Sequence, residues 1–386
     1  MLLEDVKLQE SNRSDKRSPY YYRSRVVRLD TDLGNVYTPS RVVSRYEYNA
    51  RSSLPLSRIL PIQTAIDFME LDERQVINMK TDAKIGNKII GITKQFNDIA
   101  SNAIFRISIF QPPKSVLSVM SIASKIDFAD LQAKFFQINL NAGLVTYPHL
   151  DLPLTDYMSF IDSRYRRNQD LSTIFTLDMG MEPTNFENLL GHLASKEQPM
   201  IILLIYRNVE RTLPQHNVIN SYFDNEKLLF FACQVEREES QSHSSNLHAV
   251  SYGGGFDLVA SKQTRGWPNK ENVGLSKLKM FDPVHCSLRN LEDVLSDPTR
   301  DVLKEFDIPK DNFHDIEYIK SIIKGFRGAV VHPEKYDRLY YFTKVHEAIV
   351  SSKLFDTTRS KIGLNEMEQY IKNTNLRLAP MIKNRT

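Results

Sequence analysis

Two apolar runs decide the expected fold of this chain: PMIILLIY at residues 199–206 and LLFFACQ at residues 228–234. Both are nearly continuous in apolar residues, which is typical of strands that are buried on both faces of a parallel sheet. Similar short runs lie before and after them, at 103–110 (AIFRISIF), 135–140 (FFQINL), 173–178 (TIFTLD), 248–252, 278–282 and 328–331. These runs predict eight strands.

The stretches between these runs carry apolar residues at a spacing of three to four and predict helices. They cover residues 115–125, 185–195, 288–303, 315–324 and 338–354. Repeated alternation of strand and helix indicates an α/β fold. Eight such units in this length favour a (β/α)₈ TIM-type barrel, with an open doubly wound sheet as the alternative.

Composition limits the class of protein further. The chain has 386 residues, of which 41% are apolar and 25% charged, which is enough for a substantial core. No apolar run approaches the roughly 20 residues that span a bilayer, and no signal peptide is visible. The two cysteines are too few for a disulfide framework or a four-thiolate zinc site. We expect a soluble, cytoplasmic globular protein with no membrane partner.

Positive charge is concentrated near the N-terminus. Residues 1–60 hold eleven Lys or Arg against seven Asp or Glu, although the whole chain has a net charge of only +3. Tyr20, Tyr21 and Tyr22 are interleaved with basic residues, a pattern suited to phosphates and stacked bases. The alternative explanation of this charge is a solvated, partly disordered arm. We expect a flexible basic N-terminal arm over residues 1–24 and a single domain over residues 25–386.

Polar residues and glycines repeatedly end the apolar runs. Asp178 closes TIFTLD, Gln234 closes LLFFACQ, Gly253–Gly255 follow HAVSY, and Asp282 closes LKMFD. In a parallel barrel all these ends open on one face, where active sites are assembled. The alternative for each residue alone is a turn or a helix cap.

Five segments resemble, in order, the tRNA-guanine transglycosylase family, including its DNA-modifying branch. They are Leu29–Val43 (LDTDLGNVYTPSRVV), Leu177–Pro183 (LDMGMEP), Phe231–Gln234 (FACQ), Val250–Phe256 (VSYGGGF) and Arg338–Phe355. The resemblance implies a (β/α)₈ barrel with a small N-terminal β-hairpin extension. It also implies exchange of guanine in nucleic acid, tRNA rather than DNA, for a 7-deazaguanine base through a covalent aspartyl–glycosyl intermediate.

The same resemblance implies roles for individual residues. Asp178 would hold the base at N1 and its exocyclic amine, while Gln234 and the backbone of Gly253 and Gly254 would contact its O6 edge. The basic residues Arg41, Arg45 and Arg51 would track phosphates, although ordinary surface charge is the alternative for them.

The sequence departs from the family at three points. The cysteine-rich zinc site is absent, so neither a metal nor another cofactor is expected. Asn141 stands where the family has the Asp that deprotonates the incoming base, and an amide is no general base; Asp151 is a nearby substitute. The nucleophile is Asp282 by motif or Asp307 by spacing.

Two other functions remain open. Asn141 and the missing zinc site favour a catalytically silent barrel that binds nucleic acid or serves as the partner subunit of a base-modifying complex, whereas the family itself tends to form homodimers. An unrelated metal-dependent hydrolase would instead use His149, Asp151 and His285 as ligands.

Overall fold

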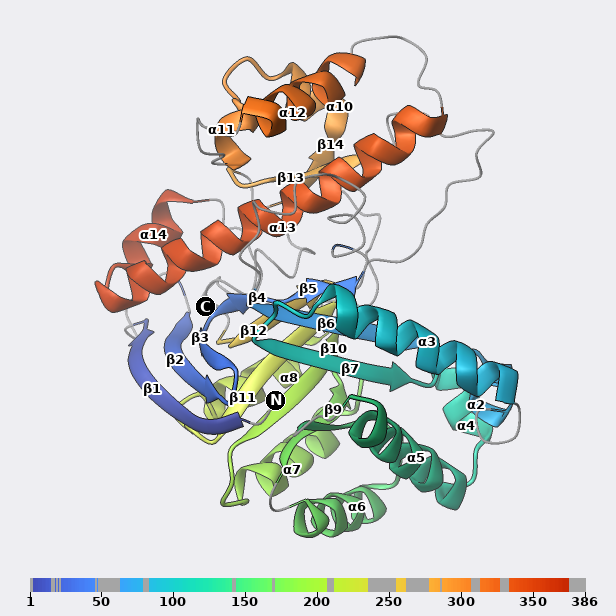
Figure 1. The fold of residues 1–386 in the computed structure, drawn as a ribbon. Helices are drawn as coiled ribbons and strands as arrows, with labels where there is room; N and C mark the ends of the chain where they lie inside the picture. The colour runs from blue at the N-terminus through green and yellow to red at the C-terminus, as the bar shows by residue number, and fades with distance from the viewer. Residues whose placement is uncertain are drawn as a thin grey trace.

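The computed structural model describes residues 3–14, 18, 20, 22–45, 47, 63–78, 83–140, 144–168, 171–206, 212–234, 255–261, 278–284, 287–306, 313–326 and 333–374. They form a mixed α/β fold in which a parallel sheet is flanked by helices (Figure 1). The expected α/β class is therefore confirmed. Within these ranges, no helix combines the length and the apolar character needed to cross a membrane.

The centre of the molecule consists of parallel strands in two sheets. The larger sheet has the order β4-β12-β11-β10-β9-β8, and every pairing in it is parallel. Its strands are β4 (Ser40–Arg41), β8 (Leu144–Tyr147), β9 (Ser172–Asp178), β10 (Met200–Tyr206), β11 (Leu228–Gln234) and β12 (Leu258–Ser261). The smaller parallel sheet contains β5 (Val43–Ser44), β6 (Thr64–Glu70) and β7 (Phe105–Gln111). Only Val42 separates β4 from β5, and its amide donates to the Val259 carbonyl at 2.8 Å, so the two sheets meet there.

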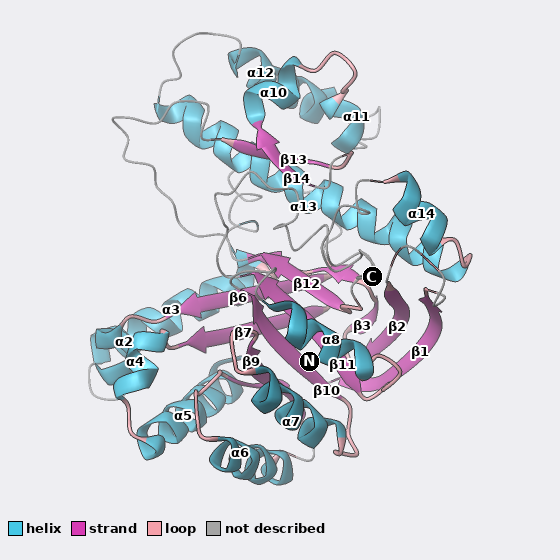
Figure 2. Cartoon of the chain, turned by 180° about the vertical axis from the view of Figure 1, so that it is seen from behind, coloured by secondary structure: helices cyan, strands magenta, loops and turns pink. Residues whose placement is uncertain are grey.

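Helices follow most of these strands, and those that lie between β8 and β11 pack against one face of the larger sheet (Figure 2). The helices in this part of the chain are α2 (Glu73–Asn78), α3 (Ala83–Ile99), α4 (Lys114–Val119), α5 (Ile122–Leu140), α6 (Leu154–Arg167), α7 (Pro183–Ala194) and α8 (Leu213–Ser221). Alternate strand residues such as Phe175, Ile202 and Phe230 share a buried cluster with Phe186 and Leu190 of α7. We call this group the helix-covered cluster.

The strand residues that alternate with these point to the opposite face of the sheet. They form a second buried cluster, which we call the strand-lined cluster. It takes buried apolar residues from each of β6 to β12, for example Ile107, Ile174, Leu203 and Phe231. Among the described residues its members come from strands and from residues that adjoin them, and none comes from a helix. Burial on both faces explains why these strands read as continuous apolar runs in the sequence.

The N-terminal residues form an antiparallel sheet of β1 (Leu3–Arg13), β2 (Arg23–Thr31) and β3 (Gly34–Tyr37). The expected hairpin extension is therefore present. The expected flexible arm is wrong for residues 3–13, because β1 pairs along its length with β2.

The C-terminal part carries a small antiparallel ribbon and the remaining helices. It comprises β13 (Lys279–Asp282), β14 (Ser287–Asn290), α10 (Leu291–Ser296), α11 (Val302–Phe306), α12 (Phe313–Phe326), α13 (Pro333–Gly363) and α14 (Met367–Asn373). The long helix α13 runs between this ribbon and the parallel strands in both views (Figures 1 and 2). The expectation that 278–282 belongs to the parallel sheet is wrong, since β13 pairs antiparallel with β14.

Two further expected elements differ in the structure. The run FFQINL lies in α5 rather than in a strand, and Phe135 packs its ring 5.7 Å from that of Phe110. The stretch 288–303, expected as one helix, is divided among β14, α10 and α11. The expected strands at 248–252 and 328–331 lie outside the described residues.

Candidate active site

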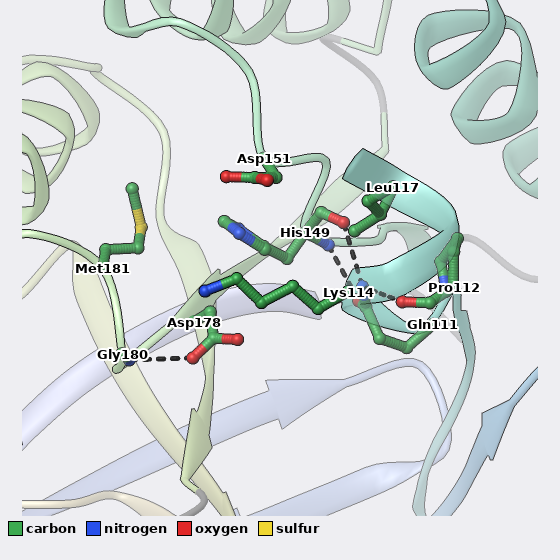
Figure 3. Close-up of a pocket in the computed structure, with 9 residues that line it drawn as sticks. All are labelled: Gln111, Pro112, Lys114, Leu117, His149, Asp151, Asp178, Gly180 and Met181. Carbon is green, nitrogen blue, oxygen red and sulfur yellow. Dashed lines mark hydrogen bonds between the residues drawn. The ribbon is translucent and has the colours of Figure 1, made fainter. Parts of the chain in front are cut away.

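A pocket opens at the carboxyl ends of β7, β8 and β9 (Figure 3). It encloses about 370 Å³ of non-protein space, part of which is open solvent. Its lining residues are Gln111, Pro112, Lys114, Leu117, His149, Asp151, Asp178, Gly180 and Met181. The carboxyl ends of parallel strands are where ligands and reacting groups gather in α/β folds.

Gln111, the last residue of β7, holds the segment that follows β8. Its Oε1 accepts the His149 amide at 2.9 Å, and its Nε2 donates to the His149 carbonyl at 3.0 Å. Both bonds are buried, and the Gln111 side chain also donates to the Pro112 carbonyl at 3.1 Å. The amide of Gln111 therefore fixes the backbone from which His149 projects.

Asp178 projects into the pocket from the end of β9. Its Oδ1 accepts the Gly180 amide at 2.8 Å, and its carbonyl accepts the Met181 amide at 3.1 Å, which closes a tight turn. A Cβ on residue 180 would lie 3.1 Å from Asp178 Oδ1, which is closer than most such contacts in proteins. Glycine at this position therefore avoids a steric conflict with the carboxylate.

Asp151 faces the same pocket from the other side of His149 (Figure 3). Its backbone has a φ of 49°, in the left-handed region that non-glycine residues rarely adopt. The buried Lys125 ammonium donates to the Asp151 carbonyl at 2.8 Å and supports this conformation. Such backbone conformations are enriched at functional sites. No hydrogen bond reaches the Asp151 carboxylate from the part of the chain that the structure describes.

The His149 imidazole lies between the two carboxylates (Figure 3). Burial lowers the pKa of His149, while the nearby charges of Asp178 and Asp151 act in the opposite direction and those of Lys114 and Lys125 add to the lowering. Its side chain is therefore neutral at neutral pH. The Lys114 side chain extends between His149 and Asp178, so a positive charge lies at the same opening (Figure 3).

Two of the predicted site residues, Asp178 and Asp151, are brought together in this pocket. Gln234 ends β11 as expected, opposite Tyr206 in the parallel register. The other predicted residues Asp307, Asn141, Gly253, Gly254 and Arg51, together with His285, lie outside the described residues.

Asp282 does not join this pocket, which corrects its expected place on the same rim. It ends β13 in the antiparallel ribbon and is fully buried. Its Oδ2 lies 3.0 Å from Nη1 of Arg289, and its Oδ1 lies 3.1 Å from Nη1 of Arg300. The two arginines place positive charge beside this buried carboxyl group.

Gly255, the described residue of the run Gly253–Gly255, has a different position from the expected one. Gly255 precedes β12, so it lies at the amino end of that strand, whereas Asp178 lies at the carboxyl end of β9. Its φ is +80°, and a Cβ there would lie 3.3 Å from Phe223 and 3.6 Å from Asn220 Oδ1, at the end of α8. Gly255 thus serves close packing.

Arg41 and Arg45 do not present free charge to a phosphate backbone. The Arg41 side chain is 0% exposed, and its Nη2 donates to Glu47 Oε1 at 2.7 Å. Arg45 is 14% exposed, and its Nη1 lies 3.6 Å from Oδ2 of the buried Asp67. The expected phosphate role is therefore wrong for Arg41 and has no support from the position of Arg45.

Sequence reasoning overlooked Gln111 and Lys114 in this pocket. The polar end of β7 gave a signal for Gln111, because it closes an apolar run in the same way as Asp178. Nothing in the sequence singled out Lys114. His149 was recognised only as a metal ligand, yet no group of three or more metal-binding side chains occurs among the described residues.

Comparison with known proteins adds no assignment: neither the models of protein families nor the curated proteins include a match to this chain.

Proposed function

We propose that this chain is a transglycosylase that exchanges guanine in tRNA for a 7-deazaguanine base, and that the pocket at the ends of β7, β8 and β9 is its active site. The observation that carries the proposal is the presence of Asp151 and Asp178, 27 positions apart in the sequence, on the walls of one pocket. The ordered resemblance to the transglycosylase family supplies the reaction.

Each carboxylate has a distinct role in this proposal. Asp178, oriented by the Gly180 amide, accepts hydrogen bonds from N1 and the exocyclic amine of the base. Asp151 attacks the anomeric carbon of the ribose, forming a covalent glycosyl ester as guanine leaves; the entering base then displaces it. Asp151 suits this role because its carboxylate faces the pocket without a hydrogen bond from the described residues.

A closed (β/α)₈ barrel is part of the same proposal. Residues 40–44 pair with β12 on one side and with β6 on the other. At the opposite edges of the two sheets, Thr146 Oγ1 of β8 donates to the Ser108 carbonyl of β7 at 2.8 Å. The strand-lined cluster, with members from each of β6 to β12, supports an interior of the kind that such a barrel has.

The test is exchange of labelled guanine into a tRNA transcript and into duplex DNA, together with trapping of a covalent protein–nucleic acid adduct. Asp151→Asn should abolish the adduct and lower the exchange rate by a factor on the order of 10⁴. Asp178→Asn should weaken guanine binding roughly 10- to 100-fold, since it removes hydrogen bonds to a charged acceptor. Asp224→Asn, on an exposed turn before β11, is the matched control. An adduct that persists in Asp151→Asn contradicts the proposed nucleophile.

A second candidate is a subunit that binds a base without exchanging it. One observation favours it: Asp282, which resembles the family's nucleophile, is engaged by Arg289 and Arg300 outside the pocket. In that case the wild-type chain binds guanine in an Asp178-dependent manner, and neither substrate gains label.

A further inference from the structure

The His149 imidazole is a buried group that faces the pocket with one nitrogen unused. His149 is only 6% exposed, yet its ring reaches the pocket between Asp151 and Asp178 (Figure 3). Its Nδ1 is buried and has no hydrogen-bond partner among the described residues. Because nearly all buried polar atoms in proteins are hydrogen-bonded, an unused nitrogen at a pocket indicates that a ligand supplies the partner.

We infer that His149 is a catalytic residue that accepts, on Nδ1, the proton which the entering base loses. This inference rests on the proposed exchange reaction and adds a residue to it. The N–H bond of the base breaks, and its electron pair forms the bond to the anomeric carbon. The Asp151 carboxylate leaves that carbon in the same step. The released guanine takes up one proton when it leaves, so the complete exchange consumes none.

The charged groups around His149 suit this transfer. When the ring accepts a proton, Asp151 and Asp178 stabilise the imidazolium, as carboxylates beside a catalytic histidine do. The resting ring is neutral, because burial lowers its pKa and Lys114 and Lys125 act in the same direction. A neutral ring is the form that accepts a proton.

The neighbouring aromatic residue does not compete for the nitrogen. The Tyr157 ring of α6 lies 6.0 Å from the imidazole, centroid to centroid, and its hydroxyl donates to the Thr176 carbonyl at 2.9 Å. Since Tyr157 is committed elsewhere, Nδ1 remains available to the ligand. The two hydrogen bonds of Gln111 hold the His149 backbone, so the ring needs no rearrangement before transfer.

The experiment compares His149→Asn with the wild-type chain over a pH series. Asparagine places a hydrogen-bond acceptor near the position of Nδ1, but it takes up no proton at these pH values. We expect kcat to fall by roughly 10²- to 10⁴-fold, guanine affinity to be retained, and the acidic limb of the wild-type rate profile to disappear. His192→Asn is the control, because His192 of α7 pairs with Asp162 at 2.8 Å and does not line the pocket.

Two results would overturn the inference. The first is an acidic limb that persists unchanged in His149→Asn. The second is nitrogen NMR of the histidine-labelled wild-type chain showing that Nδ1 of His149 already carries a proton at neutral pH, a measurement that does not depend on how the variant folds. Exchange that occurs normally in His149→Asn refutes the role of His149 alone, whereas no exchange in the wild-type chain refutes the proposed reaction itself.

Discussion

Replacing Asp257 by asparagine should strongly destabilise the chain, because this carboxylate holds the N-terminal sheet against the parallel strands. Asp257 lies just before β12, and its partner Arg25 lies in β2. The two side chains are 0% and 2% exposed. Arg25 binds both carboxylate oxygens, with Nε to Oδ1 at 2.9 Å and Nη2 to Oδ2 at 2.7 Å.

The magnitude follows from what the substitution leaves behind. Arg25 keeps its contacts with the carbonyls of Phe223, Asn225 and Leu228, but its buried charge loses its counter-ion. Breaking a buried ion pair by removing one partner costs about 3–5 kcal/mol. Asp257 Oδ2 also accepts the Phe230 amide at 2.8 Å, a bond that asparagine keeps only in one orientation of its amide. The expected loss is a large part of the 5–15 kcal/mol typical of a whole domain.

The assay is equilibrium urea unfolding, with the free energy of unfolding extrapolated to water. Asp5→Asn is the matched control, since Asp5 lies on β1 with a side chain that is 51% exposed, and its midpoint should not move. The double variant Arg25→Met with Asp257→Leu should recover much of the loss, because it leaves no unpaired buried charge. A loss below about 1 kcal/mol for Asp257→Asn would refute the reasoning, since that is the range of exposed pairs.

Two further predictions concern buried carboxylates outside the pocket. Burial raises the pKa of Asp67 to about 6 despite the nearby Arg45, so its contribution to stability is present at low pH and is lost as the pH rises through about 6. Lowering the pH from about 7.5 to about 5 should therefore stabilise the wild-type chain relative to Asp67→Asn by about 1.4 kcal/mol; urea midpoints that change in parallel would contradict this. Asp282→Asn should cost about 1–3 kcal/mol, because it weakens buried contacts to Arg289 and Arg300 while Arg300 keeps its pairing with Glu305. The proposed guanine binding per folded molecule should stay constant; loss of the proposed exchange at unchanged stability would restore Asp282 as the reacting carboxylate.

The sequence predicted best those strands and helices in which the spacing of apolar residues matches the faces that are buried in the fold. Residues 200–206 and 228–234 form β10 and β11, as the sequence predicted, and pair in register along their length. The stretches 185–195 and 338–354 correspond to α7 and α13. In these segments the order of apolar and polar residues is compatible with only one kind of secondary structure that buries all the apolar side chains.

The predictions were wrong for short apolar runs that can be buried equally well in more than one way, as a strand or a helix, or in a parallel or an antiparallel pair. FFQINL is apolar enough for a strand, but it continues α5, and the strand that follows is the four-residue β8. LKMFD is a strand, yet it pairs with β14 through hydrogen bonds that no apolar pattern specifies. Partner choice depends on contacts between distant segments, which a local pattern does not contain.

The site was predicted in part for the same reason. A polar residue at the end of a buried strand is a local feature, and it identified Asp178. The neighbourhood of Asp151, His149 and Lys114 depends on how three strand ends lie side by side. Asp282 carried the same local signal and lies elsewhere, because its strand belongs to another sheet.

The paired hydrogen bonds between Gln111 and the backbone of His149 make the geometry of the pocket sensitive to mutation at a residue that carries no charge. A single replacement at residue 111 would let the segment after β8 drift, while every ionisable group of the pocket stayed in the sequence. A chain with such a replacement would keep Asp151, His149 and Asp178, but its sequence would differ from this one only at an uncharged side chain.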